Sequence, residues 1–263
     1  MEQVSTKPGA LAIAVTAACA AVVATVFVAG GAAVAGESRP RAVIELFTSQ
    51  GCGKCPPADA LLGRLAADDT LVALTFAVDY WDYLGWKDTA ARPEFTQRQR
   101  GYAEARGDRT VYTPQVVIDG RTHVVGSDRD AIESTVSALV DKNEAPMVDV
   151  DAETTRDSLV VRIADGPDAL AGTRATVWLV RYDRTRTIPI GRGENSGRTV
   201  TYTHLVKALQ PIGMWKGKAL RIELPRQEMV HENEEGCAIL LQAEGEGGPG
   251  PILGARRVER LGS

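Results

Sequence analysis

Residues 45–57 have the sequence ELFTSQGCGKCPP, which leads from a strand-like segment into a turn that carries two cysteines. The residues before this turn, 42–47 (AVIELF), are apolar and rich in strand formers, and residues 58–67 (ADALLGRLAA) have apolar side chains at helical spacing. Cys52 and Cys55 therefore lie where a strand passes into a helix. Two thiols at this spacing can close a small disulfide ring.

Two prolines, Pro56 and Pro57, directly follow the second cysteine. Proline has no N–H to donate, and the residue before a proline avoids helical geometry. We expect the regular helix to begin at one of these prolines, with both thiols in the turn before it. Positive potential from the helix entrance and from Lys54 would favour a thiolate, although the late helix start weakens the contribution of the helix.

Three uses of the thiol pair are open from these residues: redox exchange, a permanent structural disulfide, and half of a metal site. The chain has no second closely spaced cysteine pair to complete a four-ligand zinc site. The three histidines, His123, His204 and His231, are scattered, so neither a metal site nor a cofactor is predicted. The strand, turn and helix context favours a redox role.

Composition limits the class of protein. The chain has 263 residues, of which 44% are hydrophobic, and this is enough to build a buried core. Its formal net charge is -4, and no cluster of Lys and Arg is interleaved with aromatic residues. We therefore predict no nucleic-acid partner.

The amino-terminal residues have the pattern of a targeting segment. Residues 10–33 are an almost unbroken apolar run, and Ala33-Val34-Ala35 has the small residues that a signal peptidase recognises. We predict that residues 1–35 are a signal peptide and that the protein is periplasmic or secreted. The run is also long enough to cross a bilayer, so the alternative is an inner-membrane anchor through residues 10–33, with the protein facing the periplasm.

Beyond the first helix, the pattern predicts a buried strand, a helix, a two-stranded hairpin and a last helix. These elements are residues 71–80, Pro93–Arg106, Gln115–Ile118 with Thr122–Val125 around Asp119-Gly120, and a helix capped by Asp128 that runs to Lys142. The order is thus β, α, β, α, β, β, α. It predicts a sheet covered by helices.

This order, together with Cys52-Gly53-Lys54-Cys55 and Thr113-Pro114, resembles the thioredoxin-like superfamily. The segments LFTSQGCGKCPPADALL, DYWDYLGWKD and YTPQVVIDGR are similar to an uncharacterised family of exported bacterial proteins with a thioredoxin-like core, over nearly all of the mature chain. The resemblance implies an α/β thioredoxin-like domain at residues 36–145, with a central mixed sheet flanked by helices. It also implies a cis bond before Pro114, in a segment that lies against the thiols.

The resemblance also implies roles for individual residues. In the superfamily the first thiol is exposed and attacks, and the second is shielded and resolves the mixed disulfide, so Cys52 and Cys55 are the expected catalytic residues. Thr113 and Pro114 would form the edge on which a substrate docks. Glu45 lies in an apolar strand, near the position of a buried acid in thioredoxins. It would be either a proton relay, or a carboxylate that faces solvent or pairs with an Arg or Lys.

Aromatic residues follow the second predicted strand. Because ligands collect outside the carboxyl ends of strands in open α/β sheets, Trp81 and Trp86 are candidates for substrate binding. The alternative is that they cover the core beneath a second domain.

Beyond about residue 145, short and often alternating apolar runs predict a mainly-β, sandwich-like domain at residues 146–263. The expected strands are residues 147–151, 159–164, 175–182, 200–203, 219–224, 238–242 and 252–258, with one helical turn at 204–209. Residues 191–199 (GRGENSGRT) miss the spacing of a phosphate-binding loop, and we expect a hairpin-like loop that could face the first domain. Cys237 is expected to be a buried apolar residue.

These observations predict an exported thiol-disulfide oxidoreductase-like protein that uses Cys52 and Cys55 for dithiol-disulfide exchange. Its partner would be a protein that carries thiols or disulfides, or a small thiol. Two alternatives stay open: a module or chaperone that binds copper or another soft metal through the same thiols, and a redox-silent adaptor.

Overall fold

The computed structural model describes residues 1–2, 39–225 and 235–258. The predicted leader, apart from its first two residues, lies outside the described residues. The helices are α1 (Pro56–Leu65), α2 (Pro93–Arg106) and α3 (Arg129–Asp141), with 3-10 turns η1 (Asp82–Leu84) and η2 (Asp168–Leu170). In the part of the chain that the structure describes, no helix is long and apolar enough to cross a membrane.

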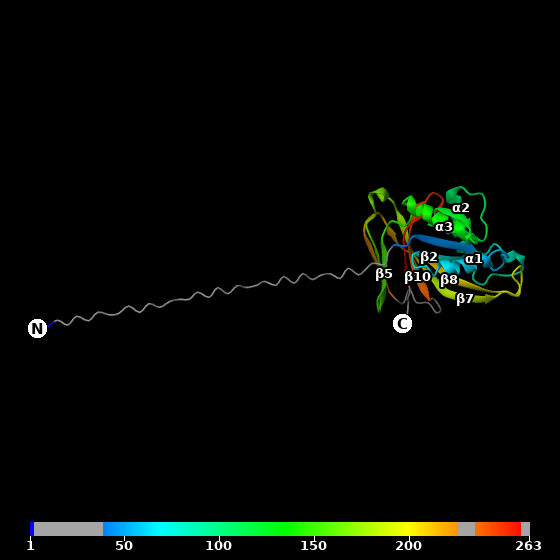
Figure 1. Cartoon of the computed structure of the whole chain (residues 1–263), viewed down its shortest axis with the longest axis horizontal. Helices are drawn as coiled ribbons and strands as arrows, with labels where there is room; N and C mark the ends of the chain where they lie inside the picture. Colours follow the sequence, from blue (N-terminus) through cyan, green and yellow to red (C-terminus); the bar gives the residue numbers. More distant parts are fainter. Residues whose placement is uncertain (3–38, 226–234, 259–263) are drawn as a thin grey trace. The chain divides into compact units, whose positions relative to one another are not determined.

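The strands form a large mixed sheet and a small antiparallel one (Figure 1). They are β1 (Ala42–Thr48), β2 (Leu71–Ala77), β3 (Gln115–Ile118), β4 (Thr122–Val125), β5 (Val150–Thr154), β6 (Ser158–Ile163), β7 (Ala175–Pro189), β8 (Thr199–Trp215), β9 (Leu220–Pro225), β10 (Gly236–Gly245) and β11 (Gly248–Val258). The large sheet has the order β11-β10-β7-β8-β2-β1-β3-β4, and the small sheet has the order β5-β6-β9. The protein is thus a mixed α/β fold with few helices.

Local sequence signals account for the first half of the chain. Helix α1 begins at Pro56, as the two prolines predicted, with Cys55 as its N-cap. The hairpin between β3 and β4 turns at Asp119-Gly120, where both residues have positive φ values of 51° and 64°. Helix α3 follows Asp128, whose side chain accepts a hydrogen bond from the N–H of Ala131, as expected for an N-cap.

Strands from both halves of the chain belong to the same sheet. Strand β8 runs parallel to β2, with Leu205 opposite Thr75, and it also pairs with β7 along most of its length. The boundary predicted at residue 145 therefore does not divide the sheet. Strands β5, β6 and β9 of the small sheet pack over one end of β7, β10 and β11. Cys237 is buried there, as expected.

The helical turn predicted at residues 204–209 is wrong, because these residues lie inside β8. Strand β8 has neighbours on both edges, and successive side chains are buried on opposite faces. Leu205 packs against Tyr202 and Ile188, whereas Val206 packs in the cluster that contains Phe47. Burial on both faces outweighs the helical spacing of this short apolar run.

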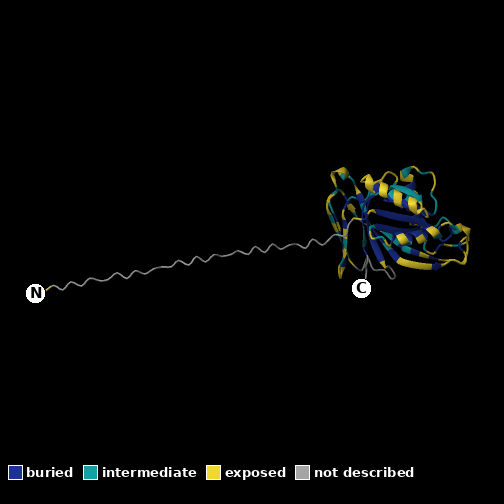
Figure 2. Ribbon diagram, viewed as in Figure 1, coloured by how far each residue is buried: buried dark blue, intermediate teal, exposed yellow. Residues whose placement is uncertain are grey.

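The two faces of the sheet are covered by different helices, and the central strands are buried (Figure 2). Phe95 and Tyr102 of α2 pack on the face that carries Val43 and Phe47 of β1. Helices α1 and α3 pack on the other face, against Ala42, Ile44 and Leu46. Strand β1 is therefore central to both halves of the core, and its carboxyl end leads directly into the cysteine turn.

Candidate functional site

The cysteine turn contains a closed disulfide between Cys52 and Cys55, with a Cα–Cα distance of 5.4 Å. The Cys55 N–H donates to the Cys52 carbonyl at 3.1 Å, and the Cys52 N–H donates to the Ser49 carbonyl at 3.1 Å. Cys52 is 1% exposed and Cys55 is 0% exposed, whereas Lys54 is exposed. The expectation that Cys52 is exposed is therefore wrong for this oxidised form.

The loop between β7 and β8, residues 190–198, lies on this turn, and we call it the strap. Asn195 is 1% exposed, and its Nδ2 donates to the carbonyl oxygens of Gln50 and Cys52, both at 2.9 Å. Glu194 Oε2 accepts a hydrogen bond from the Gly53 N–H at 2.8 Å. The loop that was expected to face the first part of the chain thus binds the backbone of the thiol turn on both sides of Cys52.

The strap has a defined backbone of its own. The Gly197 N–H donates to the Ile190 carbonyl at 2.8 Å, and the Ile190 N–H donates to the Arg198 carbonyl at 2.9 Å. Gly193 and Gly197 have φ values of 78° and 79°, a region that side chains disfavour. These turns direct Asn195 inward, so that the strap presents an amide to the carbonyl groups of the thiol turn.

Trp81 and Trp86, the predicted substrate-binding aromatics, both lie at the thiol turn, with their indole N–H groups already bonded. Trp86 Nε1 donates to Gln50 Oε1 at 2.8 Å, and Trp81 Nε1 donates to Thr113 Oγ1 at 2.8 Å. A Cβ atom on Gly51 would lie 3.0 Å from Trp81 Cβ, so the aromatic loop packs closely on the turn.

Tyr83 and Leu84, between these two tryptophans, are 81% and 40% exposed. They give the rim of the site an apolar surface.

Thr113 and Pro114 are also at this end of the sheet. The peptide bond between them is cis, and β3 begins directly after them, with Gln115 opposite Phe47 of β1. Gly126 packs against both Pro114 and Ala58, which places Pro114 beside the first turn of α1. The structure therefore brings together the two cysteines, the two tryptophans and the Thr113-Pro114 segment.

Asp59 is a buried acid beside the thiols that was not predicted from the sequence. Its N–H donates to the Cys55 carbonyl at 3.1 Å, which places it one helical turn after Cys55 and on the same side of α1. Thr48 Oγ1 donates to Asp59 Oδ1 at 2.7 Å, while Asp59 Oδ2 has no hydrogen-bond partner among the described residues. Burial raises the pKa of Asp59 to about 8, although the bond from Thr48 opposes this shift.

A second buried acid, Asp88, holds the aromatic loop against the thiol turn. Its Oδ2 accepts a hydrogen bond from the Gln50 N–H at 2.8 Å, and its Oδ1 accepts from the N–H groups of Ala90 and Ala91. Burial raises the pKa of Asp88, and its charge contributes to the raised pKa of Asp59. Asp59 and Asp88 are thus two buried acids next to the thiol turn.

The sequence contains a signal for these two acids but none for Asn195. Asp59 interrupts the apolar face of α1, where an acid needs a specific reason, and Asp88 ends the segment DYWDYLGWKD. Asn195 is 143 residues away from the carbonyl that it binds, in a loop whose composition is that of any polar turn.

Glu45 lies on the opposite face of β1 from Thr48 and α1. Arg98 Nε donates to Glu45 Oε1 at 2.7 Å, and the hydroxyl of Tyr102 donates to Glu45 Oε2. Burial disfavours the charged guanidinium, but the neighbouring Glu45 carboxylate leaves the pKa of Arg98 above its ordinary value. The structure therefore matches the alternative in which Glu45 pairs with an arginine, and it gives Glu45 no contact with the thiols.

No metal-binding cluster accompanies the cysteines. Among residues 39–225 and 235–258, no group of three or more His, Cys, Asp and Glu side chains is arranged to hold a metal ion.

Two comparisons place this arrangement among known proteins. Residues 43–242 match the family model described as Protein of unknown function (DUF1223). The crystal structure of protein AGR_C_4864 from Agrobacterium tumefaciens is 35% identical in sequence, with a TM-score of 0.76, and the match covers 84% of this chain and 95% of that chain. No curated protein matches the chain.

The buried ion pair on the α2 face gives a first prediction. Arg98→Met should lower the free energy of unfolding by about 3–5 kcal/mol, because the Glu45 carboxylate would stay buried without its ionic partner. The double variant Glu45→Gln/Arg98→Met should recover much of this loss. Urea unfolding at pH 7 measures both effects, and an Arg98→Met protein as stable as the wild type would contradict the buried pairing.

The strap gives a second prediction. Asn195→Ala removes two hydrogen bonds that close the strap, each contributing about 1 kcal/mol, so the disulfide should be reduced about 10- to 30-fold faster by a small reductant. Release of thiols in the presence of dithiothreitol measures this rate.

The matched control for the strap is Arg192→Gln, an exposed residue of the same loop, which should leave the rate of reduction unchanged. Equal rates for Asn195→Ala and the wild type would show that reductants reach the disulfide without displacing the strap.

Proposed function

We propose that this chain, which belongs to the DUF1223 family of proteins of unknown function, exchanges disulfides with dithiol partners through Cys52 and Cys55. The observation that carries the proposal is the disulfide itself, which joins two cysteines at the carboxyl end of a central strand. The buried acid Asp59 lies one helical turn beyond it. A disulfide with a purely structural role would need neither a buried acid one helical turn away nor a loop that can move away from the turn.

A thioredoxin-like origin of the first half is part of this proposal. The chain order β1-α1-β2-α2-β3-β4-α3 supports it, as do the parallel pairing of β1 with β2, the antiparallel pairing of β1 with β3 and the cis bond before Pro114. The start of α1 after both thiols and the addition of β8 beside β2 are departures from that pattern.

Exchange in the oxidising direction proceeds in two steps. A partner thiolate attacks Sγ of Cys52, a bond forms between the two sulfurs, and the bond between Cys52 and Cys55 breaks with its electron pair leaving on Cys55. The second thiol of the partner then loses its proton and attacks the mixed disulfide, which releases Cys52 as a thiolate that takes up a proton. The partner loses two electrons and two protons, and both cysteines become thiols.

Asp59 supplies the proton that Cys55 needs in the first step. With a pKa of about 8, its carboxyl group is protonated at neutral pH and can donate to a buried thiolate one helical turn away. In the reverse reaction the same carboxylate accepts the proton from Cys55. Neutralising the leaving thiolate inside the protein avoids the cost of a buried unpaired charge.

Access to Cys52 requires the strap to move, because the sulfur is buried while Asn195 and Glu194 are bonded to the turn. Once the strap is displaced, a partner would meet Trp81 and Trp86, with Thr113 and Pro114 beside them. The exposed Tyr83 and Leu84 at the rim would add apolar contact with a protein partner.

We also propose that the protein is periplasmic or secreted. A periplasmic or secreted protein would meet oxidising conditions, in which a closed disulfide persists. The apolar run at residues 10–33 would direct the chain there.

The decisive experiment is exchange with a disulfide-bonded protein such as insulin. Cys55→Ser in the reduced protein should accumulate a mixed disulfide through Cys52, because the resolving thiol is gone, whereas Cys52→Ser should abolish exchange. Mass spectrometry of the acid-quenched reaction identifies the trapped species.

Cys237→Ser is the control for these two variants, since Cys237 is buried in β10 away from the turn, and it should exchange like the wild type. Trapping through Cys55 in Cys52→Ser would reverse the two roles. If neither the wild type nor the Asn195→Ala variant exchanged disulfides with any protein or small thiol, the proposed function would be refuted.

Asp59→Asn should slow the reduction of the disulfide by a partner dithiol about 100-fold at pH 7, the size of a typical general-acid contribution. The ratio of wild-type to Asp59→Asn rates should fall as the pH rises through about 8, where wild-type Asp59 loses its proton. Taking the ratio cancels the pH dependence of the partner thiol. A ratio that is constant from pH 6 to pH 9 would exclude Asp59 as the proton donor.

Stability provides an independent readout for the same variant. The pKa of Asp59 is about 8 in the folded protein, against an ordinary value of 3.8, so between these values the folded state holds a proton that the unfolded chain has lost. Its contribution to stability is therefore fully present below about pH 4 and is lost as the pH rises to about 8. Asp59→Asn should flatten this part of the pH profile of unfolding.

A further inference from the structure

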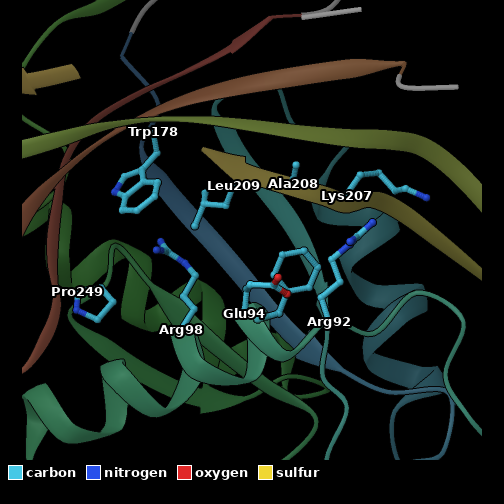
Figure 3. Close-up of a pocket in the computed structure, with 9 residues that line it drawn as sticks. Arg92, Glu94, Arg98, Trp178, Lys207, Ala208, Leu209 and Pro249 are labelled. Carbon is cyan, nitrogen blue, oxygen red and sulfur yellow. The ribbon is translucent and has the colours of Figure 1, made fainter. Parts of the chain in front are cut away.

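A cavity of about 360 Å³ lies between α2 and the strands β7 and β8, away from the thiols (Figure 3). None of its lining residues belongs to the thiol turn or to the strap. Its volume is within the range of sites that bind small molecules. The residues that matter here are Arg92, Phe95, Arg98, Trp178, Lys207 and Leu209.

One part of the cavity wall is apolar and partly flat. Trp178 of β7 and Leu209 of β8 are half-buried and point into the cavity. Phe95 of α2 belongs to the buried cluster against which both side chains pack. In Figure 3 the end of Arg98 points toward the indole of Trp178, at the end of the cavity away from Arg92 and Lys207. An apolar wall that includes a half-buried indole favours an aromatic ring, which gains stacking as well as burial.

The other part of the wall is cationic. The ends of Arg92 and Lys207 lie on the same side of the cavity (Figure 3), and Arg92 makes no ion pair or side-chain hydrogen bond with any other described residue. Lys207 is held only loosely, with its Nζ 3.8 Å from a carboxylate oxygen of Asp183. The first turn of α2, which follows Arg92, adds partial positive charge at the same place.

Three acids limit this positive charge: Asp183 beside Lys207, as described above, and Glu45 and Glu94. Glu45 neutralises Arg98 from behind, and Glu94 is a cavity residue that is exposed to solvent. Arg92 is therefore the cavity cation that has no ion pair among the described residues, and Lys207 lies on the same side of the cavity. A guanidinium with free N–H groups is suited to a carboxylate, which it can bind through two parallel hydrogen bonds.

We propose that this cavity binds a small aromatic carboxylate. The ring of the ligand would lie on the apolar wall, over Leu209 and toward Trp178, and its carboxylate would point to Arg92 and Lys207 at the other end of the cavity. An amine of the same shape would meet two cationic groups instead, and a neutral ring would leave Arg92 without a partner. The proposal does not depend on the chemistry of the thiols.

The test uses two probes of the same shape, 2-naphthoate and the uncharged 2-naphthalenemethanol, titrated calorimetrically into the folded oxidised protein. Naphthoate should bind at least about tenfold more tightly than the alcohol, because a charge-assisted pair contributes about 1.4 kcal/mol or more. Binding of naphthoate, but not of the alcohol, should weaken as the salt concentration rises.

Variants locate the binding site. Arg92→Gln and Lys207→Gln should each weaken naphthoate binding about five- to tenfold, and Trp178→Ala should weaken both probes. Arg192→Gln in the strap is the matched control and should change neither. If Trp178→Ala does not fold, Arg92→Gln still decides the question, since Arg92 is exposed at the start of a helix.

Equal affinities for the two probes would overturn the proposed preference for an anion. Binding of naphthoate that is unchanged in Arg92→Gln and Lys207→Gln would place it elsewhere and overturn the site. Absence of binding at millimolar probe concentration would overturn the proposal as a whole, while leaving disulfide exchange untouched.

Discussion

The side-chain amide of Asn195 is the contact on which the arrangement of the candidate site depends. It binds two carbonyl groups of the thiol turn from a residue 143 positions further along the chain. The amide reaches the turn only because β8 joins the sheet beside β2, so that the hairpin of β7 and β8 brings its loop to the carboxyl end of β1. The second half of the chain therefore completes the site of the first half.

The backbone of the thiol turn is held on several sides by polar groups, of which Asn195, Asp88 and Asp59 are buried and Glu194 is exposed. Asn195 and Glu194 bind it from the strap, Asp88 binds it from the aromatic loop, and Thr48 links the strand before it to Asp59. The bonds of Asn195, Asp88 and Asp59 are buried, and each satisfies a polar group that would otherwise lack a partner. Both cysteines of the turn that these bonds hold are buried.

Local features of the fold could be predicted from the sequence, because their causes are local. Pro56 fixes the start of α1, Asp119-Gly120 determines the hairpin, and Asp128 caps α3. The long pairing of β7 with β8 and its addition to the first half could not be predicted. It depends on contacts between residues far apart in sequence, and alternating apolar runs fit a separate sandwich equally well.

The buried acids show the same limit of prediction from sequence. An acid in the apolar strand β1 indicated a special environment for Glu45, but only the face of β1 decides whether it meets Arg98 or the thiols. Asp59 lies one helical turn after Cys55, and the sequence signal for it was an acid on the apolar face of α1. The acid implied by the family resemblance is Glu45 on β1, whereas the acid one helical turn from Cys55 is Asp59 on α1.

The separation of 143 residues in sequence between Cys52 and Asn195 also sets the order in which the parts of the site are synthesised. A chain made from its amino terminus must grow by roughly 140 residues after Cys52 before Asn195 exists, which takes on the order of 10–30 seconds at ordinary rates of synthesis. Throughout that interval the two cysteines have no cover. The strap can bind the thiol turn only after that interval.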